Sequence, residues 1–546
     1  MPSQQKPWSM TRVIAASSTG TAFEWYDFFI FGSLTPVIAK TFLAGLDPTS
    51  ALIAALALFA VGFAFRPLGA IIFGAMGDRV GRKATFLTTV SLMGGATFAI
   101  GLLPTYAQAG LVAPILLIFL RICQGTALGG EYGGAAIYVA EHAPDHKRGE
   151  ATGWIQSSAS LGLLAALGVI VATRTALGVE AFDAWGWRIP FLASALLLAI
   201  SLWMRVKLSE SPTFAKLRDE GELSKAPLRE AFARKDSLKQ VLIAFFAIMC
   251  AQGAVWYFTF FYMQVFLEKS LGLPAATKDW LLIAMTLVSA PLYVVFGALS
   301  DRVGRKPVML GGMLLGLALY FPGSHLIAAS VNPALVEAQR SAPVVVLTNP
   351  ATCAVQFDPT GTRRFDSACD IAKSLLVAKG ISYVNAASPD GSTSIRIGSG
   401  SLAVTGGEKL DGPGLKALKT ATGDSLKAQL VAAGYPATAD PKAVHYPTLL
   451  LVLFGFVVAA TALYGPQAAA LVEMFPTRIR YTALSLPYHI GTGWVGGFLP
   501  VTSFAIVAIT GDIYAGLWYA VAFTALSAVV TILSLKETKG KSLEEC

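Results

Sequence analysis

The chain has 546 residues, of which 54% are hydrophobic and 14% carry a charged side chain, and its formal net charge is +9 at pH 7. Soluble proteins carry charges on about a quarter of their residues, so the composition excludes an ordinary soluble globular protein. The sequence contains no Gly-x-x-x-x-Gly-Lys-Ser/Thr loop for nucleotide phosphates and no catalytic constellation. We therefore expect neither an ATP-driven pump nor an enzyme.

Twelve apolar runs are each long enough to cross a hydrocarbon layer about 30 Å thick as a helix. The runs are continuous and rich in Leu, Ala and Gly, without the alternation of half-buried strands, so we expect helices. In chain order, the predicted spans cover residues 14–38, 51–74, 84–103, 112–140, 150–172, 188–206, 240–267, 280–299, 307–329, 447–470, 482–506 and 514–535.

Lysine and arginine in the short connections indicate the orientation of these spans. From a cytoplasmic N-terminus, about two dozen cations fall on the inner side and about five on the outer side, the bias typical of bacterial membrane proteins. We therefore expect a multi-pass protein of the bacterial inner membrane with both termini in the cytoplasm. The positive net charge reflects this topology and does not indicate nucleic-acid binding.

One ten-residue phrase occurs twice, 223 residues apart. Residues 74–83 read Gly-Ala-Met-Gly-Asp-Arg-Val-Gly-Arg-Lys, and residues 297–306 read Gly-Ala-Leu-Ser-Asp-Arg-Val-Gly-Arg-Lys. Each copy joins two apolar runs. A cationic hairpin in the same place in two halves of a chain indicates a duplicated membrane protein.

The doubled hairpin resembles the signature of the major facilitator superfamily. Further phrases at 23–28, 66–69, 121–134, 185–191 and 473–481 are similar to the metabolite–proton symporter family, whose members carry citrate, α-ketoglutarate, shikimate, or proline and betaine. The resemblance implies an all-α membrane protein with twelve transmembrane helices in two six-helix halves. It also implies alternating access, in which the halves rock about a central site.

The chain departs from this family pattern between predicted helices 9 and 10, where about 115 polar residues take the place of a short loop. The expected organisation is a six-helix half at 1–206, a cytoplasmic linker at 207–239, helices 7–9 at 240–330, a periplasmic inserted domain at 331–446, and helices 10–12 with a cytoplasmic tail at 447–546.

The inserted segment is predicted to be a small mixed α/β domain. Residues 342–347 and 393–398 have the composition of strands, and residues 369–379 and 414–433 the periodicity of amphipathic helices. Cys353 and Cys369 both lie here, on the oxidising side of the membrane, so a disulfide is expected; two unpaired thiols are the alternative.

Charged side chains inside a membrane span are costly and usually functional. Glu24 and Asp27 share one face of the first predicted helix near the middle of the membrane and could take up and release protons. Glu131, within a glycine-rich phrase, is a further candidate. The alternative for these acids is a structural ion pair with an arginine.

An arginine that faces a water-filled cavity suits a substrate carboxylate. Arg121, with Gln124 on the same face, and Arg66 are the principal candidates. The alternatives are a permanent ion pair of Arg121 with Glu24 or Asp27, and packing of Arg66. Arg188 is either a ligand contact or an interfacial anchor. Neutral contacts to a small organic molecule are expected from Tyr26, Gln252, Tyr257, Tyr464 and His489.

The repeated hairpins are expected to gate the transport path, since an aspartate at a helix end can pair with basic side chains or cap the positive end of a helix in the other half. By resemblance, this network steadies the outward-facing state. The residues concerned are Gly74, Asp78, Arg79, Gly81 and Arg82 in the first copy, and Gly297, Asp301, Arg302, Gly304 and Arg305 in the second.

Together these features predict a proton-coupled secondary transporter that takes up a small organic metabolite, with a carboxylate as the first expectation. The alternatives are a zwitterionic compatible solute such as proline or betaine, and a transporter-like sensor that binds its ligand through the inserted domain. We expect a monomer in the lipid bilayer with no cofactor or metal, and residues 331–446 could contact a periplasmic partner.

Overall fold

The computed structural model describes residues 10–43, 58, 61–206, 210–349, 351, 353–354 and 364–543. Ten helical segments within these residues are long and apolar enough to cross a membrane. They are α5 (Arg82–Leu102), α7 (Val112–His142), α8 (Arg148–Leu177), α10 (Arg188–Val206), the run from α13 to η5 (Lys235–Ser270), α16 (Ala275–Val303), α17 (Arg305–Val331), α21 (Tyr446–Met474), the run from α22 into α23 (Arg480–Val507) and α24 (Leu517–Ser534).

The first two predicted spans differ from this pattern. The run predicted at 14–38 divides into α1 (Met10–Ser33) and α2 (Thr35–Phe42), and Pro36 lies in the first turn of α2, where a missing N–H is tolerated. The span predicted at 51–74 is described from Leu58 and residue 61 onward. It includes α4 (Arg66–Arg79), whereas residues 51–57 and 59–60 lie outside the described part of the chain.

Two helical runs contain π-helical segments, in which the helix is locally wider than an α-helix. The run from α13 (Lys235–Ile243) contains η3 (Ala244–Met249), α14 (Cys250–Tyr257), η4 (Phe258–Tyr262), α15 (Met263–Val265) and η5 (Phe266–Ser270). The other consists of α22 (Arg480–Ile490), η7 (Gly491–Gly496) and α23 (Leu499–Thr510). Short helices are α6 (Tyr106–Ala109), η1 (Asp145–Lys147), α9 (Val179–Ala181), η2 (Phe182–Gly186), α11 (Pro212–Asp219) and α12 (Pro227–Phe232).

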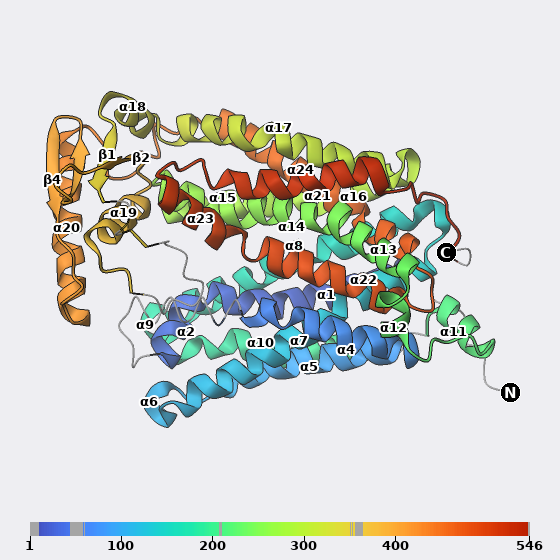
Figure 1. Cartoon of the computed structure of the whole chain (residues 1–546). Helices are drawn as coiled ribbons and strands as arrows, with labels where there is room; N and C mark the ends of the chain where they lie inside the picture. The colour runs from blue at the N-terminus through green and yellow to red at the C-terminus, as the bar shows by residue number, and fades with distance from the viewer. Residues whose placement is uncertain are drawn as a thin grey trace.

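The long helices form two bundles (Figure 1). In the N-terminal bundle, α1 packs on α8, α5 on α10, and α7 on α4 and α5. In the C-terminal bundle, α17 and α16 pack on α21, and α14 and α17 on α24. The bundles meet mainly where α8 contacts α16 and where α22 contacts α4.

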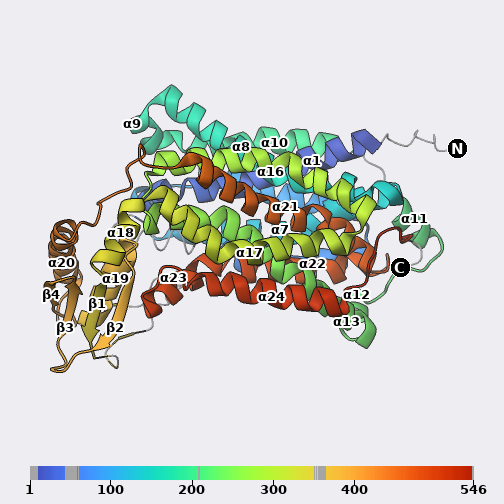
Figure 2. The ribbon, with the colours of Figure 1, turned by 90° about the horizontal axis from the view of Figure 1, so that it is seen from above.

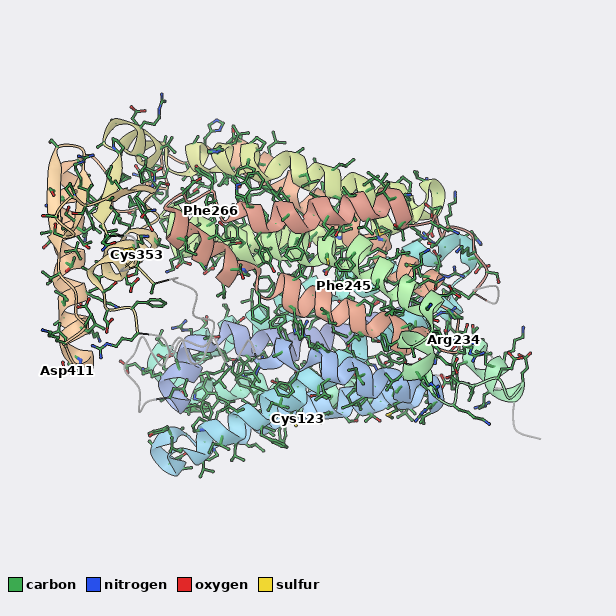
Figure 3. The ribbon with its side chains drawn as sticks, viewed as in Figure 1. Cys123, Arg234, Phe245, Phe266, Cys353 and Asp411 are labelled. Atoms are coloured by element: carbon green, nitrogen blue, oxygen red, sulfur yellow. A yellow bond between two sulfur atoms is a disulfide. The ribbon has the colours of Figure 1, made fainter. Side chains whose placement is uncertain are left out.

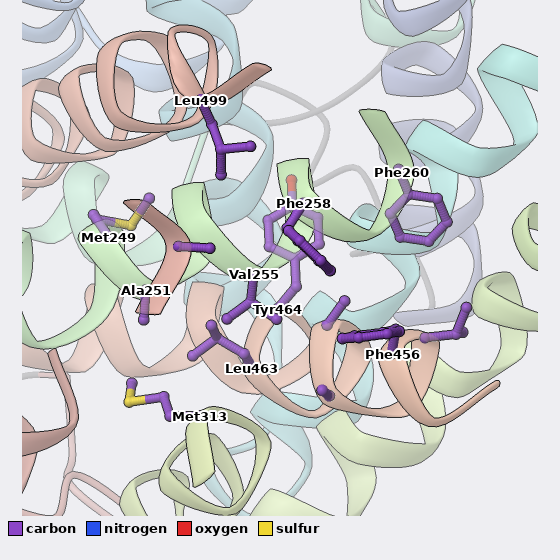
Figure 4. Close-up of a cluster of buried hydrophobic side chains, with 14 of the residues drawn as sticks. Met249, Ala251, Val255, Phe258, Phe260, Met313, Phe456, Leu463, Tyr464 and Leu499 are labelled. Carbon is purple, nitrogen blue, oxygen red and sulfur yellow. The ribbon is translucent and has the colours of Figure 1, made fainter. Parts of the chain in front are cut away.

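Each bundle has its own apolar core. Figure 4 shows part of the C-terminal core, where Val255 and Phe258 from α14 and η4 face Phe456 and Leu463 from α21. The Phe258 and Phe456 ring centroids lie 5.1 Å apart. Such close packing makes this core rigid.

The two ends of the bundles carry different structures. The short helices α11, α12 and α13 lie at one end, near the segment that follows α24, and a small β-sheet lies at the other (Figures 1 and 2). We refer to these as the terminal end and the insert end.

The domain at the insert end lies in sequence between α17 and α21. Its sheet has the order β2-β1-β3-β4, with β1 (Val344–Thr348) parallel to β2 (Tyr383–Ala387) and antiparallel to β3 (Thr393–Ile397), which pairs with β4 (Gly400–Val404). The helices are α18 (Pro333–Ser341), α19 (Ala368–Ala378) and α20 (Gly412–Ala432). Both predicted strands and both predicted helices are present, shifted by one or two residues; α18, β2 and β4 were not predicted.

Cys353 and Cys369 form a disulfide that ties the segment before α19 to the first turn of that helix; Figure 3 labels Cys353. The inserted domain is fixed to the C-terminal bundle by backbone contacts. The Tyr383 N–H donates to the Gly511 carbonyl at 2.7 Å, and the Ala439 N–H to the Gly272 carbonyl at 2.9 Å. The Asn332 side chain donates to the Leu271 carbonyl at 2.9 Å.

Candidate transport site and gates

Arg66 lies at the first residue of α4 and is buried. Its guanidinium carbon lies 4.2 Å from the ring centroid of Phe63 and 4.6 Å from that of Phe28. The group bonds to the Tyr257 hydroxyl, and its Nε and Nη2 atoms have no hydrogen-bond partner among the described residues. The strongest electrostatic influences of described residues on this group come from Tyr257, Tyr488 and Tyr464. Arg66 is therefore a buried cation with two donor groups available to a ligand.

An aromatic cluster of the C-terminal bundle reaches this cation through Tyr257. Trp256, Tyr257, Phe261 and Tyr464, which we call the aromatic wall, pack against one another with ring centroids 5.1 to 6.1 Å apart. The Tyr464 and Tyr488 hydroxyls are 3.0 Å apart, and the Trp256 ring N–H donates to the Tyr293 hydroxyl at 2.8 Å. Tyr464, Tyr488 and the buried His489 all lie within electrostatic range of Arg66.

Glu24 and Asp27 have different surroundings. Glu24 pairs with Arg205 of α10 at 2.5 Å, and both side chains are almost fully buried. Asp27 is also buried; the hydroxyls of Ser194 and Thr97 face its carboxyl group, and its Oδ1 atom has no hydrogen-bond partner among the described residues. Among the described residues, the charged side chain that acts on it electrostatically is Glu24, another acid.

Arg121 is held inside the N-terminal bundle. Its Nη1 donates to Gln124 at 2.8 Å and its Nε to the Leu58 carbonyl at 3.3 Å, and its guanidinium lies 4.1 Å from the Phe31 ring centroid. Gln124 in turn donates to the Thr97 hydroxyl at 2.7 Å. The described partner of Glu24 is thus Arg205, and Gln124 and Thr97 connect Arg121 with Asp27.

The remaining candidates take other places. The Tyr26 hydroxyl donates to the Pro190 carbonyl at 2.9 Å within the N-terminal bundle. Arg188 donates to the carbonyls of Gly101 and Leu103 at 2.8 and 2.7 Å, so it caps the end of α5. Gln252 and Glu131 are buried, and each has one side-chain oxygen without a hydrogen-bond partner in the described part of the chain.

The first hairpin joins the bundles at the terminal end. The Asp78 carboxylate accepts the N–H groups of Tyr481 and Thr482, at 3.2 and 2.8 Å, at the start of α22. Arg82 pairs with Asp78 at 2.9 Å and donates to the Thr477 carbonyl at 2.8 Å. Beside them, Glu141 of α7 pairs with Arg480 of α22 at 2.8 Å.

The second hairpin repeats this arrangement with the bundles exchanged. Asp301 accepts the N–H groups of Gly149 and Glu150, both at 2.8 Å, at the start of α8. Arg305 pairs with Asp301 at 2.6 Å and with Glu473 at 3.0 Å, and Glu473 also pairs with Arg148 of α8 at 2.8 Å. Two matching ion clusters, which we call the first and the second latch, therefore join the bundles at the terminal end.

The hairpin glycines make room for a further carboxylate. Gly81 and Gly304 have φ values of 123° and 118°, a region that favours glycine. Beside Gly304, the Glu537 carboxylate accepts the N–H groups of Arg305 and Lys306 at 2.9 and 3.0 Å. Burial raises the pKa of Glu537, but the backbone N–H groups that it accepts outweigh burial and hold the pKa below its ordinary value. Beside Gly81, the Glu210 carboxylate likewise accepts the N–H groups of Arg82 and Lys83.

Other residues of the hairpins face outward from the clusters. Arg79 donates to the Lys225 carbonyl at 2.7 Å, and the Arg302 carbonyl accepts a bond from Lys539 at 2.5 Å. Gly74 lies against the backbone of Thr482, and Gly297 against that of Gly149, where a side chain would prevent contact between the bundles.

Several residues of these ion clusters were not predicted from the sequence. A second repeated pattern, Glu-x-x-Pro-x-x-x-Arg at 141–148 and 473–480, could have revealed Glu141, Glu473 and the pairing roles of Arg148 and Arg480. Arg205 stands next to a basic linker, where it has the composition of an interfacial anchor, so no local pattern separates it from its neighbours.

A cavity of about 520 Å³ lies between the bundles, toward the insert end. It is lined by α1, α2 and α8 on one side and by Trp256, Phe261 and the first half of α16 on the other. The hydroxyl of Ser160 of α8, which lines the cavity, lies 3.1 Å from the hydroxyl of Ser289 of α16. The cavity lining does not include Arg66, but two members of the aromatic wall line it and a third, Tyr257, bonds to Arg66. Among the described residues, no cluster of His, Cys, Asp or Glu could hold a metal ion.

Two helical bundles that are joined by ion clusters at one end and enclose a cavity toward the other have the architecture of a membrane transporter. Residues 18–336 match the family model described as Major Facilitator Superfamily, and residues 426–546 that described as Sugar (and other) transporter. The first match covers more than half of the chain, which therefore belongs to the major facilitator superfamily, a family of transporters rather than enzymes.

Three relatives illustrate this membership. The chain is 37% identical over 331 residues to the proline/betaine transporter of Salmonella typhimurium, a match over 59% of this chain and 66% of that protein, slightly under two thirds of its length. It is 36% identical over 333 residues to the glycine betaine/proline/ectoine/pipecolic acid transporter OusA of Dickeya dadantii, over 59% and 66%. It is 37% identical over 337 residues to the inner membrane metabolite transport protein YhjE of Escherichia coli, over 60% and 76%.

Solved structures share the fold. The proton:xylose symporter XylE bound to 6-bromo-6-deoxy-D-glucose matches with a TM-score of 0.62 and 16% identity, over 98% of both chains. The inward open conformation of XylE from E. coli matches with a TM-score of 0.52 and 16% identity, over 98% of this chain and 99% of that one.

Proposed function

We propose that this chain takes up a zwitterionic compatible solute, such as proline or a betaine, together with protons across the bacterial inner membrane. The observation that carries the proposal is Arg66, a buried guanidinium with two donor atoms that have no partner among the described residues and with the aromatic wall reaching it through Tyr257. The relatives named as proline/betaine transporters support the same class of substrate.

The charges available at the site favour a substrate with one carboxylate. Two parallel bonds from the Nε and Nη2 atoms of Arg66 match a carboxylate. Arg121 is close enough to repel Arg66, which makes an anion there more favourable, but its own donors already bond to Gln124 and Leu58. A citrate-like acid would bring further negative charges for which the described residues provide no second available cation.

The aromatic wall suits the other end of a zwitterion. A methylated ammonium group is stabilised over the faces of Trp and Tyr rings by about 0.5–2 kcal/mol, and quaternary ammonium ligands are typical occupants of aromatic cages. Trp256 and Phe261 face the cavity, while Tyr257 bonds to Arg66. A small zwitterion could therefore place its carboxylate on Arg66 and its ammonium group on the wall. The zwitterion, which the sequence offered as an alternative, replaces the simple carboxylate as our preferred substrate.

Asp27 is our candidate for the proton-binding group. An ionised carboxylate in a membrane interior without a cationic partner is unfavourable, and binding a proton relieves that cost. With the terminal end in the cytoplasm, the closed latches and the cavity near the insert end correspond to an outward-facing state. Proton and solute then enter together, and the bundles rock to release them inside.

Equilibrium binding tests this proposal. Purified protein in nanodiscs is titrated calorimetrically with glycine betaine, proline, citrate, α-ketoglutarate and shikimate. We expect heats from betaine or proline, and a loss of affinity above tenfold in Arg66→Ala, because removing one partner of a buried charged pair costs about 2–5 kcal/mol.

Arg188→Gln is the matched control, since it also removes a guanidinium, but one that caps α5 and lies over the Trp187 ring. It should leave the affinity unchanged. Tight binding of citrate or α-ketoglutarate without binding of betaine or proline would overturn the proposal, as would full affinity in a folded Arg66→Ala variant.

A further inference from the structure

Tyr481 is the second residue of α22, yet its side chain lies inside the N-terminal bundle. The side chain is fully buried, and its hydroxyl donates to the Gly130 carbonyl of α7. Its backbone N–H donates to Asp78 of α4 at 3.2 Å. One residue of the C-terminal bundle is therefore held by both α4 and α7 of the other bundle.

Glycines form the recess that receives this ring. A Cβ atom on Gly77 would overlap the ring, one on Gly133 would lie 2.6 Å from the Tyr481 Cε2 atom, and one on Gly134 would lie 2.6 Å from the hydroxyl oxygen. Real Cβ atoms do not approach so closely, so the ring fits only because these positions lack side chains. We call the space lined by Gly77, Gly133 and Gly134 the glycine recess. It gives a reason for part of the glycine-rich phrase at 129–134.

The corresponding position in the other latch holds no side chain. Gly149 follows Arg148 as Tyr481 follows Arg480, and the two arginines pair with the matching acids Glu473 and Glu141. Gly149 instead lies directly on the backbone of Gly297, without a ring between the helices. The two latches thus share their charges but differ in shape: one is a smooth backbone contact and the other a seated aromatic ring.

We propose that Tyr481 is a positioning residue that sets the balance between the closed and open forms of the terminal end. This inference rests on the alternating-access function proposed above. Parting of α22 from α4 and α7 must withdraw the ring from the glycine recess, whereas α8 can turn on α16 without moving a side chain out of a cavity. The ring therefore stabilises the closed form, and the glycine contact serves as the pivot.

Distances between two spin labels test this inference directly. Val80 and Val303 are exposed, and each lies in one of the two hairpins, one per bundle. Each valine is changed to Cys to carry a label. Cys123, Cys250 and Cys546 are replaced by Ser, and the disulfide is retained. Pulsed electron–electron double resonance in nanodiscs then gives the populations of the short and the long label-to-label distance, which report the closed and the open form.

We expect Tyr481→Ala to raise the ratio of open to closed forms about tenfold or more, because a buried ring contributes to the closed form alone. Gly77→Ala should act in the same direction, since it fills the recess from the opposite side. Tyr481→Phe keeps the ring and should shift the ratio by less than about threefold. Tyr320→Phe is the matched control: its hydroxyl bonds to Thr524 at 3.0 Å within one bundle, so its loss should leave the distances unchanged.

Unchanged distance distributions in both Tyr481→Ala and Gly77→Ala, with melting curves showing folded protein, would overturn the inference. If Tyr481→Ala does not fold, Gly77→Ala decides alone. The measurement needs no substrate. A shift in the distances without any binding of betaine or proline would therefore refute the proposed substrate and leave the role of Tyr481 standing.

Discussion

Glu24 in α1 and Arg205 in α10 form a buried ion pair, with Oε1 and Nη1 2.5 Å apart. Asp27, three residues further along α1, has no cationic partner among the described residues. Two acids that look equivalent in the sequence are thus unlike in the structure: one is neutralised by an arginine, and the other faces two hydroxyl groups. This difference is the basis on which we propose Asp27 for proton coupling and Glu24 for structural stability.

Asp27→Asn keeps the shape of the side chain but cannot bind a proton. We expect it to abolish accumulation driven by a proton gradient while preserving exchange of labelled for unlabelled solute at equal pH. Both are measured in proteoliposomes. Glu24→Gln serves as the comparison at the neighbouring acid. Gradient-driven accumulation that survives in Asp27→Asn would move proton coupling to another acid, with Glu131 as the next candidate.

Removal of Glu24 should act on stability. Glu24→Gln leaves Arg205 buried without its counter-charge, and breaking a buried pair in this way costs about 3–5 kcal/mol. We expect a clear drop in melting temperature, and partial recovery in the double variant Glu24→Gln/Arg205→Met, because the uncompensated charge is then gone. A double variant no more stable than Glu24→Gln would show that the pair is not the source of the effect.

The helical part of the fold was predictable because long apolar runs reveal themselves locally. The span predicted at 188–206 coincides with α10, whereas that predicted at 280–299 falls short of α16 at both ends. The missing turns of α16 contain charged side chains such as Lys278 and Asp279, which lower the local hydropathy but remain helical. Hydropathy detects the part of a helix in lipid and not its polar ends.

The inserted domain and the candidate site could be predicted only in part from sequence patterns. Strands β2 and β4 carry small residues with little alternation, and their pairing with β1 and β3 gives them their structure. Arg66 and Asp27 could be singled out because charges in apolar spans are rare. Their partners could not, because the Glu24–Arg205 pair joins residues 181 positions apart and Tyr481 acts through glycines on two other helices.

The Glu537 carboxylate should make the second latch sensitive to acid. Its pKa is held below the ordinary value of 4.5, so the stability that it contributes is present above that pH and is lost as the pH falls through its folded-state pKa. We expect the amides of Arg305 and Lys306 to stay protected from hydrogen exchange, after correction for intrinsic rates, from neutral pH to about pH 5 and to lose protection in stronger acid.

Glu537→Gln should reduce that protection at every pH. The matched variant Glu210→Gln should affect the amides of Arg82 and Lys83 instead, since these donate to Glu210. Equal protection in wild type and Glu537→Gln would contradict the assignment.

The inserted domain should be separable from transport. The His445 N–H donates to the Ser330 carbonyl at 2.8 Å, so the ends of α17 and α21 already lie together, and a short Gly/Ser linker can replace residues 333–443. We expect this variant to retain proton-coupled uptake with lower thermal stability, because the contacts with Gly272 and Gly511 are lost. A folded, solute-binding variant that cannot transport would make the domain part of the mechanism.

Proton-coupled uptake of a zwitterion is tested most directly with purified protein in proteoliposomes under an inward proton gradient. We predict that labelled glycine betaine or proline accumulates above its external concentration, that a protonophore abolishes the accumulation, and that Arg66→Ala and Asp27→Asn each eliminate it. Accumulation of citrate or α-ketoglutarate in place of the zwitterions, or accumulation that follows sodium and ignores protons, would contradict the proposed function.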